Sequence, residues 1–394
     1  MHVLVFGRTL PTEKSGSLGL FEFEQAGALA AYARVGYIFL ETDSILTTRK
    51  IKKIKENYRG IDTVGYYFPL GRFLGKVYNY WRFKFFKKLF QEYCDLHGRP
   101  DLIHVHFPTM VLTDEIIDFI KDRGIDLVLT EHWSWIQEKK ISEEQAGILK
   151  HAVSAAKTTI CVSRALKESV QELIGNKSDE KIRVIPNMIS DEFFQPYERA
   201  EKPDDGFVFT FIGSLKELKR VDLLIESFQD LFQNNQSVKL NIVGDGPERK
   251  ALEDLVNSES EEQIKFWGNL PKDKVYEILT GTDVYVSASH YESFGVPFIE
   301  ALAMGIPVIA SSRMPIVIYL DDNKGVIFED DNQKDLSRKM NYMYENIDNY
   351  KADQVRAGIF EEFNSDHIAR KLIAIYSAVP PSSHLLGGAR HLSY

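Results

Sequence analysis

The sequence predicts an α/β protein made of two Rossmann-like domains in tandem. Short, nearly continuous apolar runs alternate with longer amphipathic segments, and this alternation pauses once near the middle of the chain before it resumes. Strands that are covered by helices on both faces read as continuous apolar runs, so each half should contain a parallel sheet. A chain of 394 residues, 44% of them hydrophobic, is long enough for two cores.

The alternation assigns the elements in chain order. In the first half, strands are expected at 2–7, 101–107, 126–130 and 158–163, each followed by a helix. The segment 186–206 mixes prolines, acids and a glycine, which is typical of a linker rather than of a packed element. In the second half, strands are expected at 207–213, 238–244, 264–268, 283–289 and 307–311, again with helices between them. We therefore expect domains over 1–195 and 204–362, and a loose tail over 381–394 to which we assign no function.

Composition excludes several classes of protein. The net charge of −9 argues against general nucleic-acid binding. The two cysteines, Cys94 and Cys161, are too few for a disulfide framework and lack the spacing of a metal site. The N-terminus has no basic leader or cleavage site, and no run approaches the roughly 18 apolar residues of a membrane span. A cytoplasmic protein is expected.

Basic residues are concentrated in one part of the first half. Residues 49–88 contain twelve Lys or Arg and two acids, so this stretch carries +10 and the rest of the chain −19. Its second part, 71–90, combines eight aromatic residues with basic ones and has no acid; the basic residues are Arg72, Lys76, Arg82, Lys84, Lys87 and Lys88. Such a stretch suits peripheral contact with an anionic membrane at its inner face. Alternatively, the aromatic rings pack inward and the lysines are solvated.

The most specific signal is a pair of carboxylates, Glu292 and Glu300, separated by seven residues. Gly295 suits a tight loop, Pro297 is favourable in a first helical turn, and Gly305 ends the helix, so Glu292 should precede a helix and Glu300 should lie on it. A carboxylate in a helix can bind a vicinal diol such as a ribose, and the helix N-terminus can bind phosphate. The alternative is two solvated glutamates on an ordinary helix.

With these motifs, the sequence resembles family 4 of the glycosyltransferases, which have the two-domain GT-B fold. The segments 211–228, 240–252 and 264–270 look like the elements that precede the family's E-x7-E motif, and 102–108, 128–133, 160–169 and 184–189 are similar to its N-terminal domain. The final segment resembles the family's closing helix, expected at about 365–380, which crosses back toward the N-terminal domain. The resemblance implies a donor site in the C-terminal domain and an acceptor site in the N-terminal domain.

The resemblance also implies roles for individual residues. Glu300 would bind the donor ribose, Glu292 would face the donor sugar, and Lys219 would place positive charge against the leaving phosphates. The donor-binding residues would be Gly16, Gly213, Lys219, Arg220, Glu292, Ser293, Phe294, Gly295 and Glu300. The sequence departs from the family at Ser214, where an Arg is usual, and at Met188, where a Gly is usual. Arg220 is expected to compensate for Ser214.

In the N-terminal half, two histidines lie at the ends of expected strands. The resemblance implies that His106 contacts the donor sugar and acts in catalysis with Glu292 and Lys219, and that His132 lies in the acceptor wall. His104 is expected to point away from His106. Each histidine can instead be a hydrogen-bonded structural residue. Gly16 lies in a glycine-containing loop after the first strand, which suits close approach to phosphate or sugar but can equally be an ordinary βα turn.

The expected activity is retaining transfer of a sugar from a nucleotide-diphosphate sugar to a glycan or lipid-linked acceptor in polysaccharide or glycoconjugate biosynthesis, without metal or cofactor. Whether the nucleotide is UDP or GDP is left open. The main alternative, prompted by Ser214, is a non-catalytic sugar-nucleotide-binding partner subunit of another transferase. A dinucleotide oxidoreductase, suggested by the segment 243–249, is disfavoured because the third glycine of the phosphate fingerprint is missing.

Overall fold

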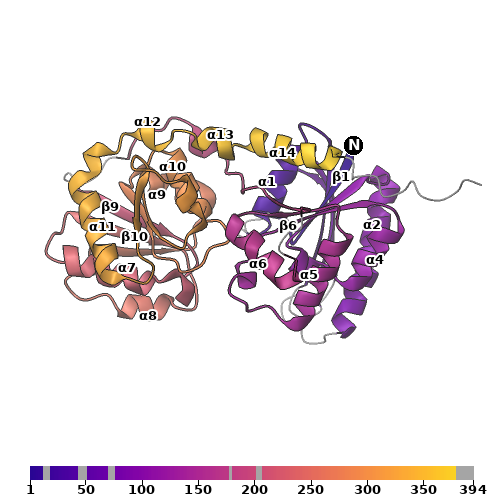
Figure 1. The fold of residues 1–394 in the computed structure, drawn as a ribbon, viewed down its shortest axis with the longest axis horizontal. Coiled ribbons are helices and arrows are strands. Elements are labelled where there is room, and N and C mark those ends of the chain that lie inside the picture. Colours follow the sequence, from indigo (N-terminus) through magenta and orange to yellow (C-terminus); the bar gives the residue numbers. More distant parts are fainter. Residues whose placement is uncertain (12–17, 43–50, 70–75, 177–179, 201–205, 379–394) are drawn as a thin grey trace, which may run out of the picture.

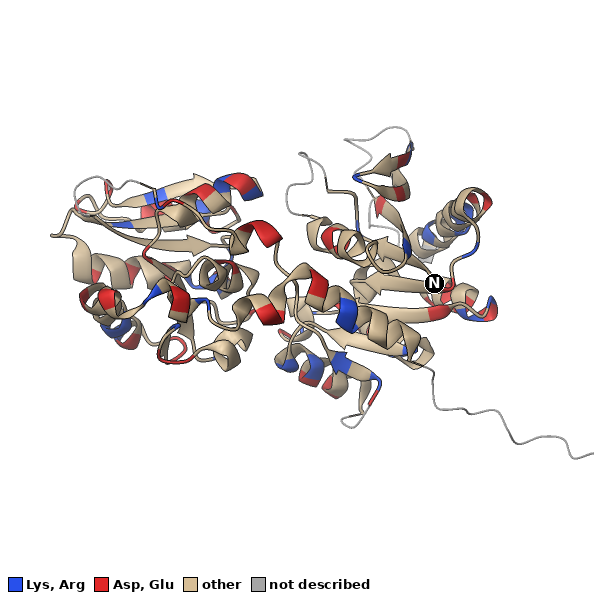
Figure 2. Cartoon of the chain, turned by 90° about the horizontal axis from the view of Figure 1, so that it is seen from above, with Lys and Arg blue, Asp and Glu red and all other residues tan. Residues whose placement is uncertain are grey.

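Two lobes lie side by side along the long axis of the molecule, each built around its own sheet (Figure 1), and they are also separate when viewed from above (Figure 2). The structure, a computed structural model, describes residues 1–11, 18–42, 51–69, 76–176, 180–200 and 206–378. The expected tail over 381–394 lies outside the described residues.

The N-terminal sheet has eight strands within the described residues, in the order β3-β4-β2-β1-β5-β6-β7-β8. All neighbours are parallel except β3 and β4. The strands are β1 (His2–Gly7), β2 (Arg34–Thr42), β3 (Lys52–Tyr58), β4 (Ile61–Phe68), β5 (Leu102–His106), β6 (Asp126–Glu131), β7 (Thr158–Cys161) and β8 (Ile182–Val184).

The C-terminal sheet has six parallel strands in the described part of the chain, in the order β11-β10-β9-β12-β13-β14. The strands are β9 (Phe207–Ile212), β10 (Val238–Val243), β11 (Ile264–Gly268), β12 (Val284–Ser287), β13 (Val308–Ser311) and β14 (Gly325–Phe328). The prediction of two Rossmann-like α/β domains is confirmed.

Strands β2, β3 and β4 were not predicted individually. Strand β2 is apolar and buried, whereas β3 is exposed over most of its length and alternates basic with other residues. The turn between β3 and β4 has Arg59 and Gly60 at positive φ, which lets β3 fold back antiparallel at the edge of the sheet. Exposed lysines on an edge strand also oppose pairing with another chain.

Helices cover both faces of each sheet (Figure 1). In the N-terminal lobe, alternate residues of β1 face α1 and α14 on one side and α2, α4 and α5 on the other. None of the described helices is both long enough and apolar enough to cross a bilayer. The helices are α1 (Leu20–Leu29), α2 (Lys76–His97), α3 (Pro108–Val111), α4 (Asp114–Asp122), α5 (Glu143–Ala155), α6 (Arg164–Ile174), α7 (Val221–Phe232), α8 (Arg249–Asp254), α9 (Lys272–Thr280), α10 (Val296–Ala303), α11 (Gln333–Asn346), α12 (Ala352–Val355), α13 (Ile359–Phe363) and α14 (Ser365–Ser377).

Short 3-10 helices connect several of these elements, and one of them corrects the expected linker. They are η2 (Ser134–Ile136), η3 (Asp191–Phe194), η4 (Glu217–Lys219), η5 (Pro315–Tyr319) and η6 (Ile347–Asn349). The segment 186–206 was predicted to contain no packed element, but Phe193 of η3 is fully buried in the core that also contains α10. The apolar residues within this acidic, proline-containing segment therefore pack between the lobes.

The last described helix, α14, returns to the N-terminal lobe and lies along α1 (Figure 1). It buries Ile368, Ala369 and Leu372 against that lobe. Near its end, the hydroxyl of Tyr376 lies 2.7 Å from Nδ1 of His104 on β5. The C-terminal segment of the chain thus contributes to the N-terminal core.

Candidate active site

The loop that carries Glu292 leads into α10, which carries Glu300. Gly295 is the N-cap of α10 and has φ 97°, a left-handed conformation that glycine adopts without strain, and Pro297 lies in the first turn. Glu292 precedes the helix and Glu300 lies one turn inside it, as the sequence predicted. Both carboxylates lie near the buried phenol of Tyr285. Burial, and next the charges of Glu292 and Glu300, raise the pKa of Tyr285 well above its usual value.

The N-terminal end of α10 presents free backbone donors. No described group accepts a hydrogen bond from the N–H groups of Ser293, Phe294 or Gly295. The side chain of Phe294 is buried and packs near Phe363, so only its backbone can meet a ligand. Unpaired N–H groups at a helix N-terminus attract anions such as phosphate.

Lys219 lies beside this loop and forms an ion pair with Glu292. Both side chains are half-buried, and Ser289 Oγ lies 3.4 Å from the same carboxylate oxygen. Lys219 ends η4, and the N–H of His290 donates to the carbonyl of Leu218 at 2.8 Å, which fixes η4 against the Glu292 loop. The structure therefore brings two of the three predicted catalytic residues together.

Glu300 is buried, and only 7% of its surface is exposed. Burial is the main cause that raises its pKa to about 7; the charge of Lys272 acts in the opposite direction, and Glu24 and Glu192 add to the rise. No described group forms a hydrogen bond with its carboxyl. Lys272 pairs with Glu24 of α1 at 3.0 Å, so Glu300 lies close to the contact between the lobes. A buried carboxyl with no partner in the protein is suited to receive ligand hydroxyls.

Gly213 and Arg220, also predicted to bind the donor, have partners within the protein. The N–H of Gly213 donates to the carbonyl of Val243 at 2.9 Å. Arg220 is the N-cap of α7 with φ 48°, and its guanidinium pairs with Asp222 and Asp331. Its charge is thus balanced by two carboxylates, so the structure gives no direct support for compensation of Ser214, and this role stays a prediction.

On the N-terminal side, His106 and His132 lie at the ends of neighbouring strands and contact each other. Nδ1 of His106 is 3.0 Å from Nε2 of His132, and both rings are buried. Burial lowers the pKa of His106 well below its usual value, with smaller effects from His132 and Arg8, and it lowers the pKa of His132 to about 3. Burial therefore favours the neutral form of both imidazoles. Nε2 of His106 is buried and has no hydrogen-bond partner among the described residues.

The prediction that His104 points away from His106 is wrong. Their ring centroids lie 4.4 Å apart, because residues i and i+2 of a strand face the same side of the sheet. His104 is 2.7 Å from Thr130 and from Tyr376, so it is a structural histidine. The structural interpretation applies to His104, while His106 keeps a free nitrogen.

Charged residues that the sequence did not single out support these histidines. Glu131 is fully buried and accepts hydrogen bonds from the Thr109 hydroxyl and from the N–H groups of His132 and Trp133, at 2.5, 2.9 and 3.0 Å. Burial raises the pKa of Glu131, and its hydrogen bonds partly offset this effect. Glu131 thereby fixes the chain that carries His132. Its only signal in the sequence was its position at a strand end, directly before His132.

Arg8, which directly follows β1, was also missed. Its Nε pairs with the fully buried Glu22 of α1 at 2.6 Å, and its guanidinium lies over the ring of Phe107, 3.5 Å from the centroid. Arg8 therefore places a positive charge beside His106 and His132. Gly16, from the loop that precedes α1, lies outside the described residues.

Both groups of residues lie where ligands bind in open parallel sheets. The strand order reverses between β1 and β5 in the N-terminal sheet and between β9 and β12 in the C-terminal sheet. His106 ends β5, whereas Gly213 follows β9 and the Glu292 loop follows β12. Ligands bind beyond the carboxyl ends of strands at such switch points. The fold thus places polar residues at the switch point of each lobe.

Comparisons with known proteins give the family. Residues 194–373 match "Glycosyl transferases group 1" and residues 43–193 match "Glycosyltransferase Family 4". The sequence is 24% identical over 299 residues to the phosphatidylinositol N-acetylglucosaminyltransferase GPI3 subunit of Saccharomyces cerevisiae, a match that covers 73% of this chain and 65% of the yeast protein. It is 25% identical over 288 residues to the N-acetyl-alpha-D-glucosaminyl L-malate synthase of Bacillus anthracis, covering 70% of this chain and 74% of that protein.

Solved structures give the fold. Sucrose-phosphate synthase from Thermosynechococcus elongatus superposes with a TM-score of 0.75 at 18% identity, covering 95% of this chain and 98% of that one. Anabaena HepE in complex with UDP and glucose superposes with a TM-score of 0.68 at 17% identity, covering 96% and 100%. The chain therefore belongs to the family 4 glycosyltransferases and has the GT-B fold.

Proposed function

We propose that this protein transfers a sugar, with retention of anomeric configuration, from a nucleotide-diphosphate sugar to a hydroxyl of a glycan or lipid-linked acceptor. The observation that carries the proposal is the N-terminal end of α10, where free N–H groups lie between Glu292, which pairs with Lys219, and Glu300, which has no hydrogen-bond partner among the described residues. Amides and an ammonium suit a diphosphate, and a buried carboxylate suits the two hydroxyls of a ribose.

Chemically, the bond between the anomeric carbon and the diphosphate oxygen breaks while the acceptor oxygen bonds to the same carbon from the same face. The acceptor proton passes to the leaving phosphate. Lys219 and the amides of Ser293 to Gly295 stabilise the charge that develops on the phosphate oxygens. His106 is assigned the contact with the donor sugar, which requires that donor binding exposes its buried, unpartnered Nε2. Within the described ranges no three His, Cys, Asp or Glu side chains are grouped as a metal site, and metal independence stays a prediction.

A panel of nucleotide sugars tests the donor assignment. The names of two relatives specify N-acetylglucosaminyl transfer, so UDP-N-acetylglucosamine is the first donor to test, followed by other UDP and GDP sugars. We expect saturable binding of one donor and its slow hydrolysis when no acceptor is present, measured by mass spectrometry of the released nucleotide. Absence of binding to every donor would contradict the proposal.

A non-catalytic sugar-nucleotide-binding subunit is the second candidate. It is favoured by Ser214, at the position where the family usually has an arginine, and by the pairing of Arg220 with two acids. The same panel separates the two functions. A donor that binds but is neither hydrolysed nor transferred to any acceptor indicates the partner subunit.

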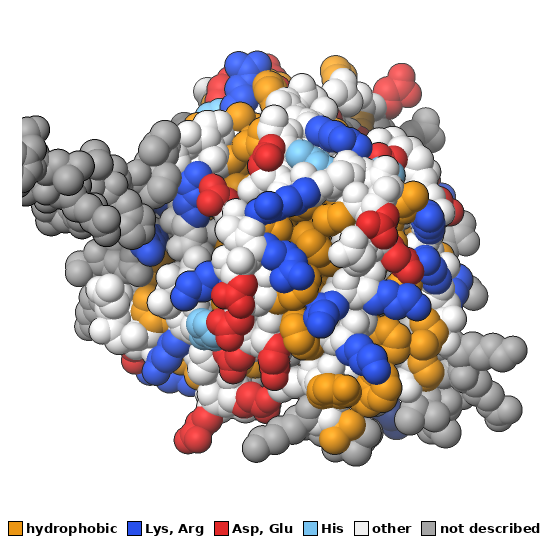
Figure 3. All heavy atoms as spheres, turned by 90° about the vertical axis from the view of Figure 1, so that its right-hand side faces the viewer, with side chains coloured by type: hydrophobic (Ala, Val, Ile, Leu, Met, Phe, Trp, Pro, Cys, Tyr) orange, Lys and Arg blue, Asp and Glu red, His pale blue; other side chains and the backbone are white. Residues whose placement is uncertain are grey.

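We also propose that the N-terminal lobe contacts an anionic membrane through a basic aromatic face, formed by Lys55 of β3 and Tyr80, Lys84 and Lys87 of α2. Tyr80 is 58% exposed, and the ammonium of Lys84 lies 4.8 Å from the centroid of the Trp81 ring. Lys53 pairs with Glu92, which joins β3 to α2. Figure 3 shows basic side chains among hydrophobic ones at this end of the molecule, with the largest group of acidic ones at the lower left of the view.

The structure divides the aromatic residues between the two interpretations. Phe86 and Phe90 are buried in the core, as the inward-packing alternative requires, whereas Tyr80 and the three exposed lysines Lys84, Lys87 and Lys88 face solvent. Arg72 lies outside the described residues, and the side chain of Lys76 is not described. The exposed set is what a membrane surface would meet.

Charge reversal tests this contact. Each Lys near an anionic surface contributes about 1 kcal/mol, so the double variant Lys84→Glu with Lys87→Glu should bind phosphatidylserine vesicles at least about 30-fold more weakly in a sedimentation assay. The matched control reverses two exposed lysines of the C-terminal lobe, Lys250 and Lys334. Equal loss in both double variants would indicate an effect of net charge alone and would contradict a defined face.

A further inference from the structure

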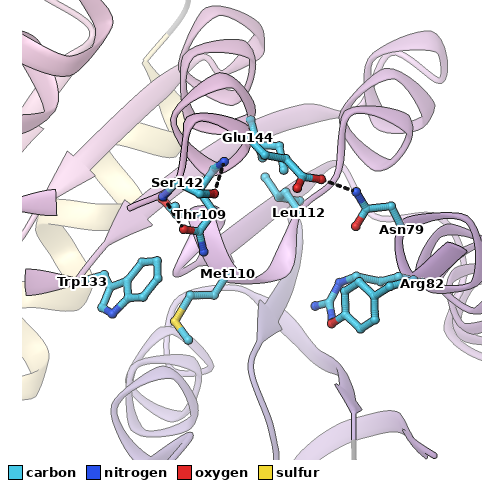
Figure 4. A pocket seen from close by; sticks show the side chains of 11 residues that line it. Asn79, Arg82, Thr109, Met110, Leu112, Trp133, Ser142 and Glu144 are labelled. Carbon is cyan, nitrogen blue, oxygen red and sulfur yellow. Dashed lines mark hydrogen bonds between the residues drawn. The ribbon is translucent and has the colours of Figure 1, made fainter. Parts of the chain in front are cut away.

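A cavity of about 250 Å³ lies in the N-terminal lobe, between α2, α3 and the beginning of α5 (Figure 4). Its wall includes Tyr78 and Arg82 of α2, Thr109 and Met110 of α3, and Trp133. The cavity is thus bounded by polar, aromatic and apolar groups together. None of these residues was assigned a role in the transfer reaction above.

Arg82 is the unusual member of this wall, because its side chain is only 4% exposed and has no acidic partner in the part of the chain that the structure describes. Its Nε donates to the carbonyl of Val111 at 2.9 Å and its Nη1 to the hydroxyl of Tyr78 at 2.8 Å, and both acceptors are neutral. No described carboxylate lies within ion-pair distance of the guanidinium, and no described group accepts from Nη2. An arginine stays charged when buried, and removing that charge from water costs free energy. The two neutral acceptors offset only part of this cost.

The acid that lines the cavity, Glu144, does not balance this charge. Glu144 accepts a hydrogen bond from Asn79 at 2.8 Å, one of the contacts drawn in Figure 4, and is exposed to solvent. The cavity therefore contains a fixed positive charge without a fixed negative one. A ligand with an anionic group would supply the missing partner, and a guanidinium binds carboxylate or phosphate with two parallel hydrogen bonds.

The cavity is connected to the candidate active site through Glu131. Thr109 lines the cavity and donates its hydroxyl to Glu131, and Glu131 in turn accepts from the N–H groups of His132 and Trp133. Trp133 lines the cavity and stacks on Trp135 with centroids 4.9 Å apart. A ligand in the cavity therefore contacts the residue that directly follows His132.

We propose that this cavity binds an anionic group of the acceptor, a phosphate or a carboxylate, on the guanidinium of Arg82, with Trp133 packed against the adjoining part of the acceptor. That the bound molecule is the sugar acceptor rests on the proposed transferase function, whereas the presence of an anion site does not. It specifies the acceptor as a molecule that carries negative charge near the hydroxyl that is glycosylated.

Direct binding tests the site without any donor. Isothermal titration calorimetry of the full chain would use sn-glycerol 3-phosphate, L-malate and the uncharged control glycerol. We expect saturable binding of at least one anion and none of glycerol. Stronger binding of the phosphate indicates an acceptor of the phospholipid headgroup type, and stronger binding of malate indicates a carboxylate acceptor. Anions that bind no better than glycerol would overturn the proposal.

Variants separate this site from unspecific attraction. Arg82→Gln should weaken binding of the anion at least about tenfold, because it removes charge-assisted hydrogen bonds, and should leave binding of the nucleotide sugar unchanged. Arg183→Gln, on the exposed edge strand β8, is the matched control and should bind like the wild type. If Arg82→Gln does not fold, Met110→Phe narrows the cavity and leaves Arg82 in place, and it should weaken the same binding.

The outcomes for the site and for the proposed function are distinguishable. Full anion affinity in folded Arg82→Gln and Met110→Phe variants would contradict the site, whatever the donor panel shows. Anion binding that depends on Arg82, combined with failure to bind every donor, would leave the cavity assigned and would contradict the transferase proposal instead.

Discussion

Replacement of Lys219 by Ala is expected to lower kcat for sugar transfer by about two to three orders of magnitude, because loss of one preorganised group that stabilises developing charge has an effect of that size. The ammonium is half-buried beside the Glu292 loop and the free N–H groups at the end of α10. Charge on the leaving diphosphate grows toward the transition state, so the effect should appear mainly in kcat and less in the donor KM.

Lys216 provides the matched control for this experiment. It lies three residues earlier in the chain and is exposed to solvent. Lys216→Ala should keep wild-type kinetics in steady-state assays with the donor that the panel identifies. A Lys219→Ala enzyme with the kcat of the Lys216→Ala enzyme would show that the ammonium does not act on the leaving group.

Replacement of Glu300 by Gln should have two opposite effects, of which the first is on donor affinity. A carboxylate that accepts two ribose hydroxyls forms charge-assisted hydrogen bonds, and an amide can accept only through one oxygen. We expect the Kd of the nucleotide sugar to rise by about 10 to 100-fold at pH 8. In the wild type, affinity should also fall as the pH drops below about 7, where Glu300 becomes protonated.

The second effect of Glu300→Gln is on stability. The pKa of Glu300 is raised from 4.5 to about 7. Between these pH values the folded protein binds one proton more than the unfolded chain. The stability that this proton contributes is lost as the pH rises through 7. Ionisation of this carboxyl therefore costs on the order of 3 kcal/mol above pH 7. Glu300→Gln should raise the free energy of unfolding at pH 8 by up to this amount, and the gain should disappear below pH 4.5.

Urea unfolding at pH 8 and pH 4 measures this difference. Glu261→Gln, an exposed carboxylate of the same lobe, is the control and should change stability little at either pH. An unchanged or lower stability of Glu300→Gln at pH 8 would mean that ionisation of the buried Glu300 does not destabilise the folded protein. A gain in stability without loss of donor affinity would show that Glu300 is a buried acid that does not bind the donor.

The local geometry of the α10 site could be predicted because each of its determinants lies within about fifteen residues. Gly295, Pro297 and Gly305 fix the beginning and end of the helix through backbone preferences that depend on those residues alone. The position of Glu292 before the helix and of Glu300 within it followed directly. The burial of Glu300 and its raised pKa did not, because they depend on residues distant in the sequence, among them Lys272 and Glu24, whose charges act on this carboxyl.

Other parts depend on distant contacts that no local pattern encodes. Arg8 pairs with Glu22, and Glu131 accepts hydrogen bonds from both the Thr109 hydroxyl and the N–H of His132. The roles of Glu22 and Glu131 therefore became visible only in the assembled sheet. Phe193 is buried between the lobes although the surrounding composition is that of a linker. The orientation of His104, in contrast, could have been predicted from strand geometry, but it was predicted wrongly.

The most direct test of donor binding is a crystal structure of the protein with the nucleoside diphosphate that corresponds to the identified donor. We expect the ribose hydroxyls within hydrogen-bond distance of Glu300 and the diphosphate on the N–H groups of Ser293 to Gly295, with Lys219 beside it. A nucleotide bound elsewhere, with Glu292 and Glu300 left without contact to it, would contradict the assignment of the donor site.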